Sequence, residues 1–456
     1  MAYISTNPFD GKVLKRFDEI SDAQLEAHIA TAHGCYTDAW RNTSFAERKA
    51  VVSRAAALMR ERSQQLAELI TLEMGKLIAQ SQGEVALSAA ILDYYADHAE
   101  AFLAPEVLKT SKGEAMVESA SLGVLLGIEP WNYPYYQIAR FAAPNLMAGN
   151  VVMVKHAGNV PQCALAFAQV MKDAGAPEGA YTNLFISKDQ ASQVIDDSRV
   201  RGVALTGSEA AGAIVAARAG KNLKKSTLEL GGSDAFIVLD DADMALALKH
   251  AVSGRMGNAG QACTASKRFI VVESVADAFL EKFKAALAEF EPGDPLDKAT
   301  KLAPLSSQTA LDNLLKQVDE AVGHGAKVLM GGKRIKGLPG AFMQPTVLTD
   351  VAPGNPAYEQ EFFGPVAMFF RVPDEAAAVA LANDSPFGLG GSVFSTDIER
   401  AKRVARAVDT GMVFINSAAV SMPDLPFGGV KNSGYGRELS EAGIMEFVNR
   451  KLIRVA

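Results

Sequence analysis

Apolar side chains in the first hundred residues recur at the three- and four-residue spacing that places them on one face of a helix. This pattern predicts helices over residues 21–82 and 85–102, with Asp22 as a cap for the first and Gly75 as an interruption. Residues 107–117 break the pattern because they are polar and contain Lys, Ser and Gly. We expect an exposed strand or hairpin there rather than a part of the core.

From residue 122 onward, short apolar runs alternate with helical patterns. The predicted strands are residues 123–128, 151–155, 182–186, 203–206, 235–239, 269–272, 327–330, 391–395 and 412–416. The predicted helices are residues 135–148, 161–174, 190–196, 243–256, 275–290, 307–323, 375–383 and 398–408. This alternation predicts an α/β fold with doubly wound parallel sheets, which bind ligands at the carboxyl ends of their strands. The tail, residues 447–455, has the pattern of an edge strand that can pair with another subunit.

Length, composition and charge narrow the class of protein. A chain of 456 residues suits two large domains or three unequal ones, at roughly 150 residues each. The net charge of −7 argues against a nucleic-acid partner, and three cysteines rule out a disulfide scaffold and fit a reducing compartment. The chain starts without the pattern of a secretory signal, and its most apolar windows are shorter than the ~20 residues that span a bilayer. We therefore expect a cytoplasmic protein without a membrane partner.

Cys263 is the first candidate for chemistry. It lies in the small-residue loop GNAGQACT at residues 257–264, which a substrate can approach. The alternative is a buried structural thiol, the usual fate of a free cysteine. Cys35 and Cys163 lie among apolar neighbours in helical patterns, so we assign both to the core.

Glu229 is the second candidate, in the peptide LELGG at residues 228–232. A carboxylate between two leucines at the end of an apolar strand is seldom buried without a purpose. Partial burial raises the pKa of such a group and makes it a base near neutral pH. The alternative is an edge-strand glutamate that faces solvent.

Three further peptides can bind a ligand. Two prolines stiffen the loop EPWNYP at residues 129–134, so Asn132 is either a fixed oxyanion donor or part of a rigid turn. Lys155 ends a predicted strand, where it either contacts a cofactor phosphate or ribose or is solvated. Residues 206–212 can present backbone N–H groups to an anion, although they are not a Walker A loop. The histidines and cysteines lack metal-binding spacings, so we expect no metal.

Taken together, these peptides resemble the aldehyde dehydrogenase superfamily, from about Asn7 to the end of the chain. The matching motifs, in the family's order, are PWNYP at 130–134, LELGG at 228–232, GQAC at 260–263, EFFGP at 361–365 and PFGGVK at 426–431. The resemblance implies two doubly wound α/β domains plus a small β oligomerisation element. Their expected boundaries are 1–104 and 122–231 for the dinucleotide-binding domain, 232–446 for the catalytic domain, and 105–121 and 447–456 for the oligomerisation element. The C-terminal strand would join that element of a neighbouring subunit in a homodimer or homotetramer.

The resemblance also implies a role for each motif. Cys263 would attack an aldehyde as a thiolate, Asn132 and the Cys263 backbone N–H would hold the oxyanion, and Glu229 would activate the water that hydrolyses the thioester. The residues that resemble the family's cofactor contacts are Trp131, Lys155, Ser208, Glu361 and Phe363.

The cofactor preference follows from a departure at Gly158. Many NAD-preferring members of the superfamily carry a Glu at this position, three residues after the lysine, where it binds ribose hydroxyls. Without that carboxylate nothing repels a 2′-phosphate, and Lys155 can pair with it. We therefore expect NADP rather than NAD, with NAD still possible.

The substrate assignment rests on Arg140 and Ser421. The peptide around Lys155 and residues 130–140 resemble the bacterial succinate-semialdehyde dehydrogenase group, which has an arginine at the position of Arg140 and a serine near Ser421 for the substrate carboxylate. The alternative for Arg140 is a structural salt bridge. Alternative functions are a broader-specificity or glutarate-semialdehyde dehydrogenase, a CoA-acylating enzyme, a cofactor-independent thiol hydrolase and a non-catalytic protein with the same fold.

Overall fold

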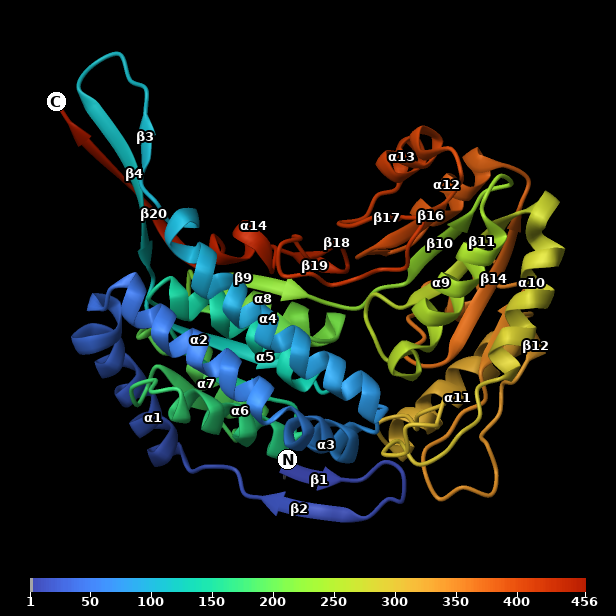
Figure 1. Cartoon of the computed structure of the whole chain (residues 1–456), viewed down its shortest axis with the longest axis horizontal. Helices are drawn as coiled ribbons and strands as arrows, with labels where there is room; N and C mark the ends of the chain where they lie inside the picture. The colour runs from blue at the N-terminus through green and yellow to red at the C-terminus, as the bar shows by residue number, and fades with distance from the viewer. Residues whose placement is uncertain (1–2) are drawn as a thin grey trace.

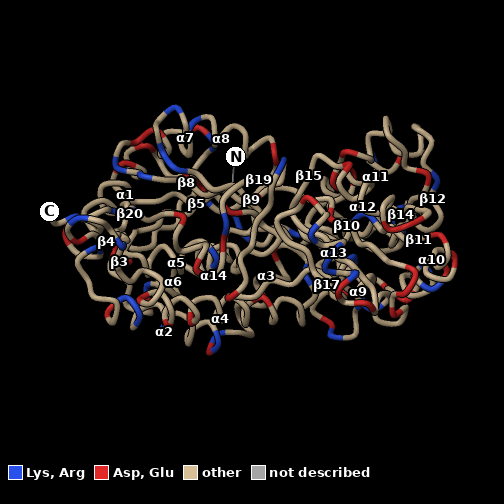
Figure 2. Tube along the Cα trace, turned by 90° about the horizontal axis from the view of Figure 1, so that it is seen from above, with Lys and Arg blue, Asp and Glu red and all other residues tan. Residues whose placement is uncertain are grey.

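The computed structural model describes residues 3–456 as two α/β bodies with a β arm that projects from the first body (Figure 1). Each body contains one large sheet with helices packed against it. Acidic and basic residues are dispersed over both bodies (Figure 2). The large sheet and packed helices of each body confirm the predicted doubly wound α/β architecture.

The first sheet has the strand order β19-β9-β8-β5-β6-β7, in which β9 to β7 are parallel. Its strands are β5 (Val124–Glu129), β6 (Val151–His156), β7 (Tyr181–Asn183), β8 (Val200–Thr206), β9 (Lys225–Glu229) and β19 (Gly434–Tyr435). Strands β5 and β6 are almost continuously apolar because helices cover both of their faces. The helices of this body are α1 (Asp22–Gly34), α2 (Phe45–Glu61), α3 (Ser63–Met74), α4 (Ile78–Phe102), α5 (Pro134–Met147), α6 (Pro161–Asp173), α7 (Lys188–Asp196), α8 (Glu209–Lys221) and α14 (Ser440–Ile444).

The second sheet has the order β12-β13-β14-β11-β10-β16-β17 and is parallel except for the pair β12–β13. Its strands are β10 (Asp234–Val238), β11 (Ser266–Val272), β12 (Lys327–Met330), β13 (Thr346–Thr349), β14 (Val366–Val372), β16 (Gly391–Phe394) and β17 (Phe414–Ile415). Its helices are α9 (Met244–Met256), α10 (Glu273–Ala288), α11 (Gln308–Gly323), α12 (Glu375–Asn383) and α13 (Ile398–Ala407). Sequence analysis missed β13 and β14, because a short apolar run without alternation does not distinguish a buried strand from other core segments.

The arm is a three-stranded antiparallel sheet of β3 (Glu106–Leu108), β4 (Glu114–Ser121) and β20 (Val448–Val455), in the order β20-β4-β3. The expectation that the C-terminal strand joins a neighbouring subunit's element is corrected here. Strand β20 pairs along its whole length with β4 of its own chain, from Val448 opposite Ser121 to Val455 opposite Glu114. One edge of the C-terminal strand is thereby satisfied within the chain, and its outer edge remains unpaired among the residues that the structure describes.

Two smaller pairs of strands complete the fold: β1 (Tyr3–Thr6) with β2 (Val13–Phe17), and β15 (Phe387–Gly388) with β18 (Val430–Lys431). Short π- and 3₁₀-helical segments occupy Cys35–Ala39, Trp40–Asn42, Gly257–Gly260 and Pro356–Tyr358. Within residues 3–456, no helix is both long and apolar enough to cross a membrane.

Two local expectations change. Ser21, rather than Asp22, caps α1, because the Ser21 hydroxyl accepts the backbone N–H of Gln24 and the Gln24 side chain accepts that of Ser21. Residues 434–444, expected in the catalytic domain, pack instead on the first body. Strand β19 pairs with β9, and the Tyr95 hydroxyl on α4 donates to the Ser440 carbonyl.

Parallel pairing brings the functional strand ends together. Ile128 lies opposite Lys155, and Thr206 lies opposite Glu229. The carboxyl ends of β5, β6, β8 and β9 therefore meet at one edge of the first sheet, which is where α/β folds bind ligands.

Candidate active site

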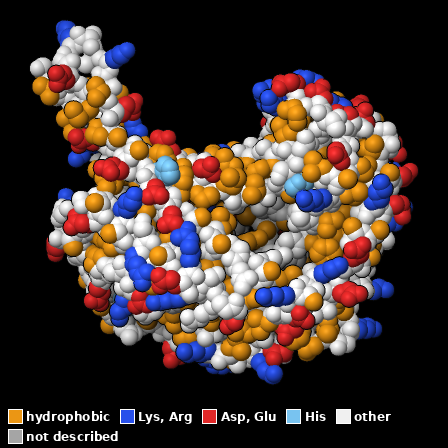
Figure 3. All heavy atoms as spheres, viewed as in Figure 1, with side chains coloured by type: hydrophobic (Ala, Val, Ile, Leu, Met, Phe, Trp, Pro, Cys, Tyr) orange, Lys and Arg blue, Asp and Glu red, His pale blue; other side chains and the backbone are white. Residues whose placement is uncertain are grey.

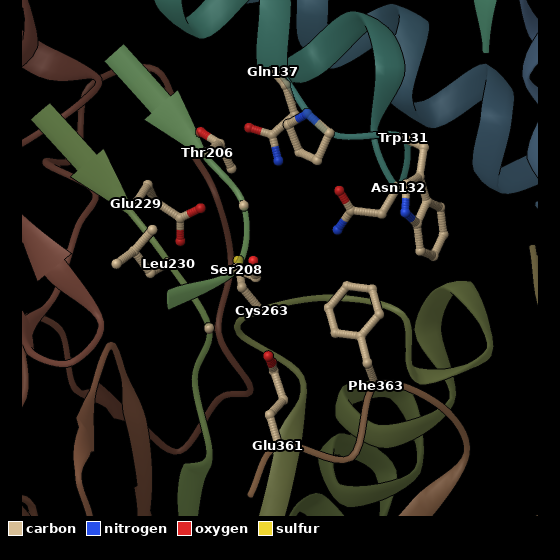
Figure 4. A pocket seen from close by; sticks show the side chains of 13 residues that line it. Trp131, Asn132, Gln137, Thr206, Ser208, Glu229, Leu230, Cys263, Glu361 and Phe363 are labelled. Carbon is tan, nitrogen blue, oxygen red and sulfur yellow. The ribbon is translucent and has the colours of Figure 1, made fainter. Parts of the chain in front are cut away.

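Residues of both bodies line a cavity of about 300 Å³, and the molecular surface is hollowed between the two bodies (Figure 3). The first body contributes Pro130, Trp131, Asn132, Gln137, Thr206, Gly207, Ser208, Glu229, Leu230 and Gly231, and the second contributes Cys263, Glu361 and Phe363. Glu229 and Asn132 point into the cavity from opposite sides, with Cys263 between them and Glu361 entering from the second body (Figure 4). The structure thus brings together three side chains that lie far apart in the sequence.

Cys263 follows the segment Gly257–Gly260 at the end of α9. The Lys267 ammonium stabilises the cysteine loop. It donates to the Cys263 carbonyl at 2.6 Å and pairs with Glu361 at 2.9 Å. Burial raises the pKa of the Cys263 thiol well above its ordinary value, and the neighbouring Glu229 carboxylate raises it further. The resting side chain is therefore a thiol that needs a base before it acts as a nucleophile.

Glu229 supplies a base at this position. It ends β9 and is only 4% exposed. Burial raises its pKa to about 7, the nearby Arg140 guanidinium opposes that shift, and Glu438 adds to it. A carboxyl group with this pKa exchanges protons near neutral pH, so it can accept a proton from the Cys263 thiol and later from a water molecule.

Asn132 lies between β5 and α5, where Pro134 is the first helical residue. Its amide nitrogen donates to the Gln261 carbonyl at 3.1 Å. A side-chain amide carries two N–H groups, so one remains for an oxyanion formed at Cys263. Trp131 and Phe363 meet edge to face beside it, with ring centroids 5.7 Å apart, and form an aromatic wall of the cavity.

A second cavity of about 340 Å³ lies between α7 and α8 and includes the end of β6. Its lining contains Lys155, Lys188 and Arg218, and no Asp or Glu among the residues that the structure describes. Burial lowers the pKa of Lys155, Glu19 opposes that shift, and Lys188 adds to it. A cavity with this charge and with apolar side chains in its lining suits an adenosine that carries a 2′-phosphate.

Ser208 joins the two cavities because it lines both. It caps α8 by accepting the N–H of Ala211, so the positive end of that helix faces the junction where a cofactor pyrophosphate is expected. Gly158 lies outside both linings, and its carbonyl accepts the Ile4 N–H at 2.9 Å. Its contact with the cofactor stays a prediction.

Arg140 is not free in the structure. It is 1% exposed, its Nε lies 2.5 Å from Glu438, and its Nη2 lies 3.1 Å from the Thr206 hydroxyl and 3.5 Å from Glu229. Its Nη1 donates to the Tyr136 hydroxyl at 3.1 Å. The structural ion pair that the sequence left open is therefore present, and Arg140 is absent from the lining of the main cavity.

Arg140 is nevertheless connected to Ser421, the other residue assigned to the substrate. The Tyr136 hydroxyl, which accepts from Arg140, lies 3.0 Å from the Ser421 hydroxyl. Hydrogen bonds therefore run from the Arg140 guanidinium to the Tyr136 hydroxyl and from there to the Ser421 hydroxyl. The hydroxyl hydrogen of Ser421 is not used in this chain.

Sequence analysis missed several residues of the site, namely Gln137, Lys188, Lys267 and Glu438. Lys188 carried a signal, because it opens a helix directly after the apolar run 182–186. Glu438 carried none, since only the folded chain brings it to Arg140.

Glu438 is expected to influence the pH at which Glu229 becomes protonated and stops acting as a base. The Glu438→Gln substitution removes a negative neighbour of Glu229 and releases Arg140 toward it, so the pKa of Glu229 should fall. Because the base works deprotonated, the acid limb of the kcat profile should move from near pH 7 to lower pH, by about one unit. The exposed Glu441→Gln on α14 is the matched control. If the acid limb of the kcat profile does not shift in Glu438→Gln, Glu438 does not control the pKa of Glu229.

The fold, the cavity that holds a cysteine and a buried glutamate, and the cation-lined cavity beside it are those of an NAD(P)-dependent dehydrogenase. The model of the aldehyde dehydrogenase family matches residues 2–453, so this chain belongs to that family.

Within the family, the similar proteins include succinate-semialdehyde dehydrogenases. The succinate-semialdehyde dehydrogenase [NADP(+)] of Deinococcus radiodurans is 54% identical over 452 residues, which cover 99% of this chain and 94% of that protein. The succinate-semialdehyde dehydrogenase [NADP(+)] 1 of Mycobacterium ulcerans is 44% identical over all of both chains. A crystal structure of the succinic semialdehyde dehydrogenase of Streptococcus pyogenes, in complex with NADP+, matches all of both chains with a TM-score of 0.98 and 49% identity.

Proposed function

We propose that this protein oxidises succinic semialdehyde to succinate with NADP. The observation that carries the proposal is the single cavity that holds Cys263, Glu229 and Asn132, next to a cation-lined cavity for the cofactor. Relatives named as NADP-dependent succinate-semialdehyde dehydrogenases, at 54% and 44% identity, support the choice of substrate and cofactor.

The chemistry starts with proton transfer from the Cys263 thiol to Glu229. The thiolate sulfur then bonds to the aldehyde carbon, and the Asn132 amide and the Cys263 backbone N–H hold the resulting oxyanion. When bound, NADP supplies the oxidation by accepting a hydride. The product on the enzyme is a Cys263 thioester. Glu229 first passes the proton from the thiol to solvent, then removes a proton from the water that hydrolyses the thioester and returns it to the departing sulfur, which releases the acid and the free thiol.

The residues of the second cavity fit NADP, with Lys155 and Lys188 holding the 2′-phosphate and Ser208 and the α8 N-terminus near the pyrophosphate. Trp131, Glu361 and Phe363 would line the nicotinamide end. No carboxylate at Gly158 opposes the phosphate. NAD lacks this phosphate, so it would form no ion pair with the two lysines.

Cofactor selection is testable at these lysines. Lys188→Met should weaken NADP binding about tenfold and leave NAD binding unchanged, because only NADP carries a phosphate to pair with the ammonium. Gly158→Glu should act in the same direction by repelling the phosphate. Titration calorimetry with each cofactor measures both effects, and Lys221→Met, outside the cavity lining, is the control. An equal loss of NAD and NADP binding would overturn the 2′-phosphate assignment.

The substrate carboxylate is proposed to bind at the Ser421 hydroxyl, which the Tyr136 hydroxyl orients, with the charge of Arg140 behind them. Arg140 itself is an unsuitable probe, because its removal leaves Glu229 and Glu438 without a buried counterion and should slow all aldehydes together. Substitutions of Tyr136, which contacts Arg140, and of Ser421, which contacts Tyr136, separate substrate binding from that ion pair.

Tyr136→Phe and Ser421→Ala should each lower kcat/KM for succinic semialdehyde by about 10- to 100-fold, the value of a hydrogen bond to a charged group. Butanal has no carboxylate, so its kcat/KM should be nearly unchanged. NADPH absorbance with the two aldehydes measures the difference. Parallel losses on both substrates would favour a broader-specificity aldehyde dehydrogenase.

A panel assay tests the proposed function as a whole. We expect NADPH formation with succinic semialdehyde to exceed that with glutaric semialdehyde and butanal, and NADP to exceed NAD. Ester hydrolysis without any cofactor, together with no aldehyde oxidation, would instead identify a thiol hydrolase.

The arm is the proposed contact between subunits. Val107, Leu452 and Val455 on it are 79%, 61% and 60% exposed, an apolar surface that a monomer would leave in water. We expect a homodimer or homotetramer built through this arm. We place the enzyme in the cytoplasm because its three cysteines are free and its catalytic thiol needs reducing conditions.

A further inference from the structure

The backbone carbonyl of Asn132 is held by two donors from different parts of the chain. The Lys76 ammonium donates to it at 2.8 Å, and the Asn258 side-chain amide donates to it at 3.0 Å. Lys76 and Asn258 are 0% and 2% exposed, so both hydrogen bonds are shielded from water. This pair of donors is called the carbonyl clamp below.

The first donor is a buried charge with a fixed position. Lys76 lies between α3 and α4, and its ammonium pairs with the Glu84 carboxylate of α4. The other oxygen of Glu84 accepts the backbone N–H groups of Tyr135 and Tyr136, which are orphan donors in the first turn of α5. The Lys76–Glu84 ion pair therefore contacts the loop of Asn132 through the Asn132 carbonyl and contacts the following helix, α5, through its first N–H groups.

The second donor belongs to the cysteine loop. Asn258 adopts a left-handed backbone conformation with φ of 53°, which costs a non-glycine residue energy, and Ala259 follows with φ of 51°. The Asn258 amide donates to the Gln261 carbonyl at 3.1 Å as well as to Asn132, and the Asn132 amide donates to that same Gln261 carbonyl at 3.1 Å. One side chain thus ties the oxyanion loop to the loop that carries Cys263.

We propose that Lys76 and Asn258 are positioning residues, which fix the Asn132 amide relative to the Cys263 sulfur so that it meets the oxyanion. The inference rests on the oxyanion role given to Asn132 in the proposed function. An oxyanion donor contributes only when it lies close to 2.7–3.1 Å from the developing charge, so a small rotation of the Asn132 peptide removes much of its effect. Two donors on one carbonyl prevent that rotation.

Asn258→Gly separates this role from a backbone role. Glycine adopts the left-handed conformation without strain, so a purely structural Asn258 predicts a parent-like or more stable protein with full activity. The carbonyl clamp predicts that the presteady-state burst of NADPH slows by about 10- to 100-fold, less than the loss of a complete oxyanion donor. The Kd for NADP should stay within about twofold, since Asn258 lies outside the lining of the cofactor cavity.

Two comparisons make the result specific. Leu223→Gly replaces another left-handed residue, φ 54° and 97% exposed, and should leave the burst unchanged. Asn258→Gly in the background of Asn132→Ala should cause no further slowing, because the clamp acts through Asn132. Additive losses in that double variant would mean that Asn258 acts by another route and would overturn the proposal.

The charged donor is tested by replacing its partner at the same time. Lys76→Met with Glu84→Gln removes the ammonium without leaving an unpaired buried carboxylate, and the side-chain carbonyl of the introduced glutamine still accepts the helix N–H groups. We expect a slower burst with little change in KM for the aldehyde. If this double variant does not fold, Asn258→Gly decides alone. If Asn132→Ala has a slow burst and Asn258→Gly has a burst like that of the parent, the carbonyl clamp is overturned. If the burst of Asn132→Ala is itself as fast as that of the parent, the proposed oxyanion role of Asn132 is overturned.

Discussion

Cys263→Ala is expected to abolish aldehyde oxidation, lowering kcat by about 10⁴-fold or more. The methyl group cannot form the bond to the aldehyde carbon, and none of the remaining described residues that line the cavity is a cysteine. The fold should survive, because the side chain becomes smaller by one atom and Lys267 grips the loop through backbone carbonyls that remain. NADPH absorbance and the unfolding temperature measure the two parts of this expectation.

Cys35→Ala is the matched control for the nucleophile. Cys35 is a buried free thiol in the first body, outside both cavities, so its removal should leave aldehyde oxidation intact. Titration calorimetry should give the same Kd for NADP in both variants. Residual turnover of Cys263→Ala at a tenth of the parent rate would remove the thioester from the mechanism.

Glu229→Gln should complete one oxidation and then stall. The amide cannot accept a proton from water, so the thioester on Cys263 accumulates and steady-state turnover falls by about 10²- to 10⁴-fold. Because the variant also lacks the base that deprotonates the Cys263 thiol, the burst of NADPH should be slower than in the parent, and it should approach one equivalent per site at a pH high enough to ionise the thiol. Rapid-mixing absorbance separates this burst from the slow phase that follows.

Glu129→Gln is a matched control on another strand of the same sheet. Glu129 ends β5, is 3% exposed, and burial raises its pKa well above the ordinary value, which favours the neutral carboxyl form. Replacing a neutral carboxyl by an amide changes no charge, and turnover should be nearly unchanged. An undiminished steady-state rate in Glu229→Gln would exclude Glu229 as the hydrolytic base.

Sequence reasoning succeeded where one short segment contains both the residue and its context. Glu229 is recognisable because a carboxylate at the end of an apolar strand, before two glycines, is unusual. The alternation of strands and helices likewise predicted the doubly wound sheets, since periodicity is a local property. The aldehyde dehydrogenase motifs added the roles, and the structure brings the three corresponding side chains to one cavity.

Sequence reasoning failed where the partner of a residue lies far along the chain. The pattern at residues 447–455 identified a strand, but the choice of β4 in the same chain depends on the path of the folded chain. Arg140 was similarly assigned without Glu438 and Thr206, which occupy its guanidinium. The carbonyl clamp was not predicted for the same reason, because Lys76, Asn132 and Asn258 come into contact only when three loops meet in the folded chain.

In the proposed mechanism, Cys263 carries the oxidised substrate until Glu229 releases it. Intact-mass and peptide mass spectrometry of Glu229→Gln, mixed with succinic semialdehyde and NADP and then quenched in acid, tests this most directly. We expect one succinyl group per chain, attached to the peptide that contains Cys263, and none when NADP is left out. An unmodified protein after a full burst of NADPH, or a succinyl group on any other residue, would contradict it.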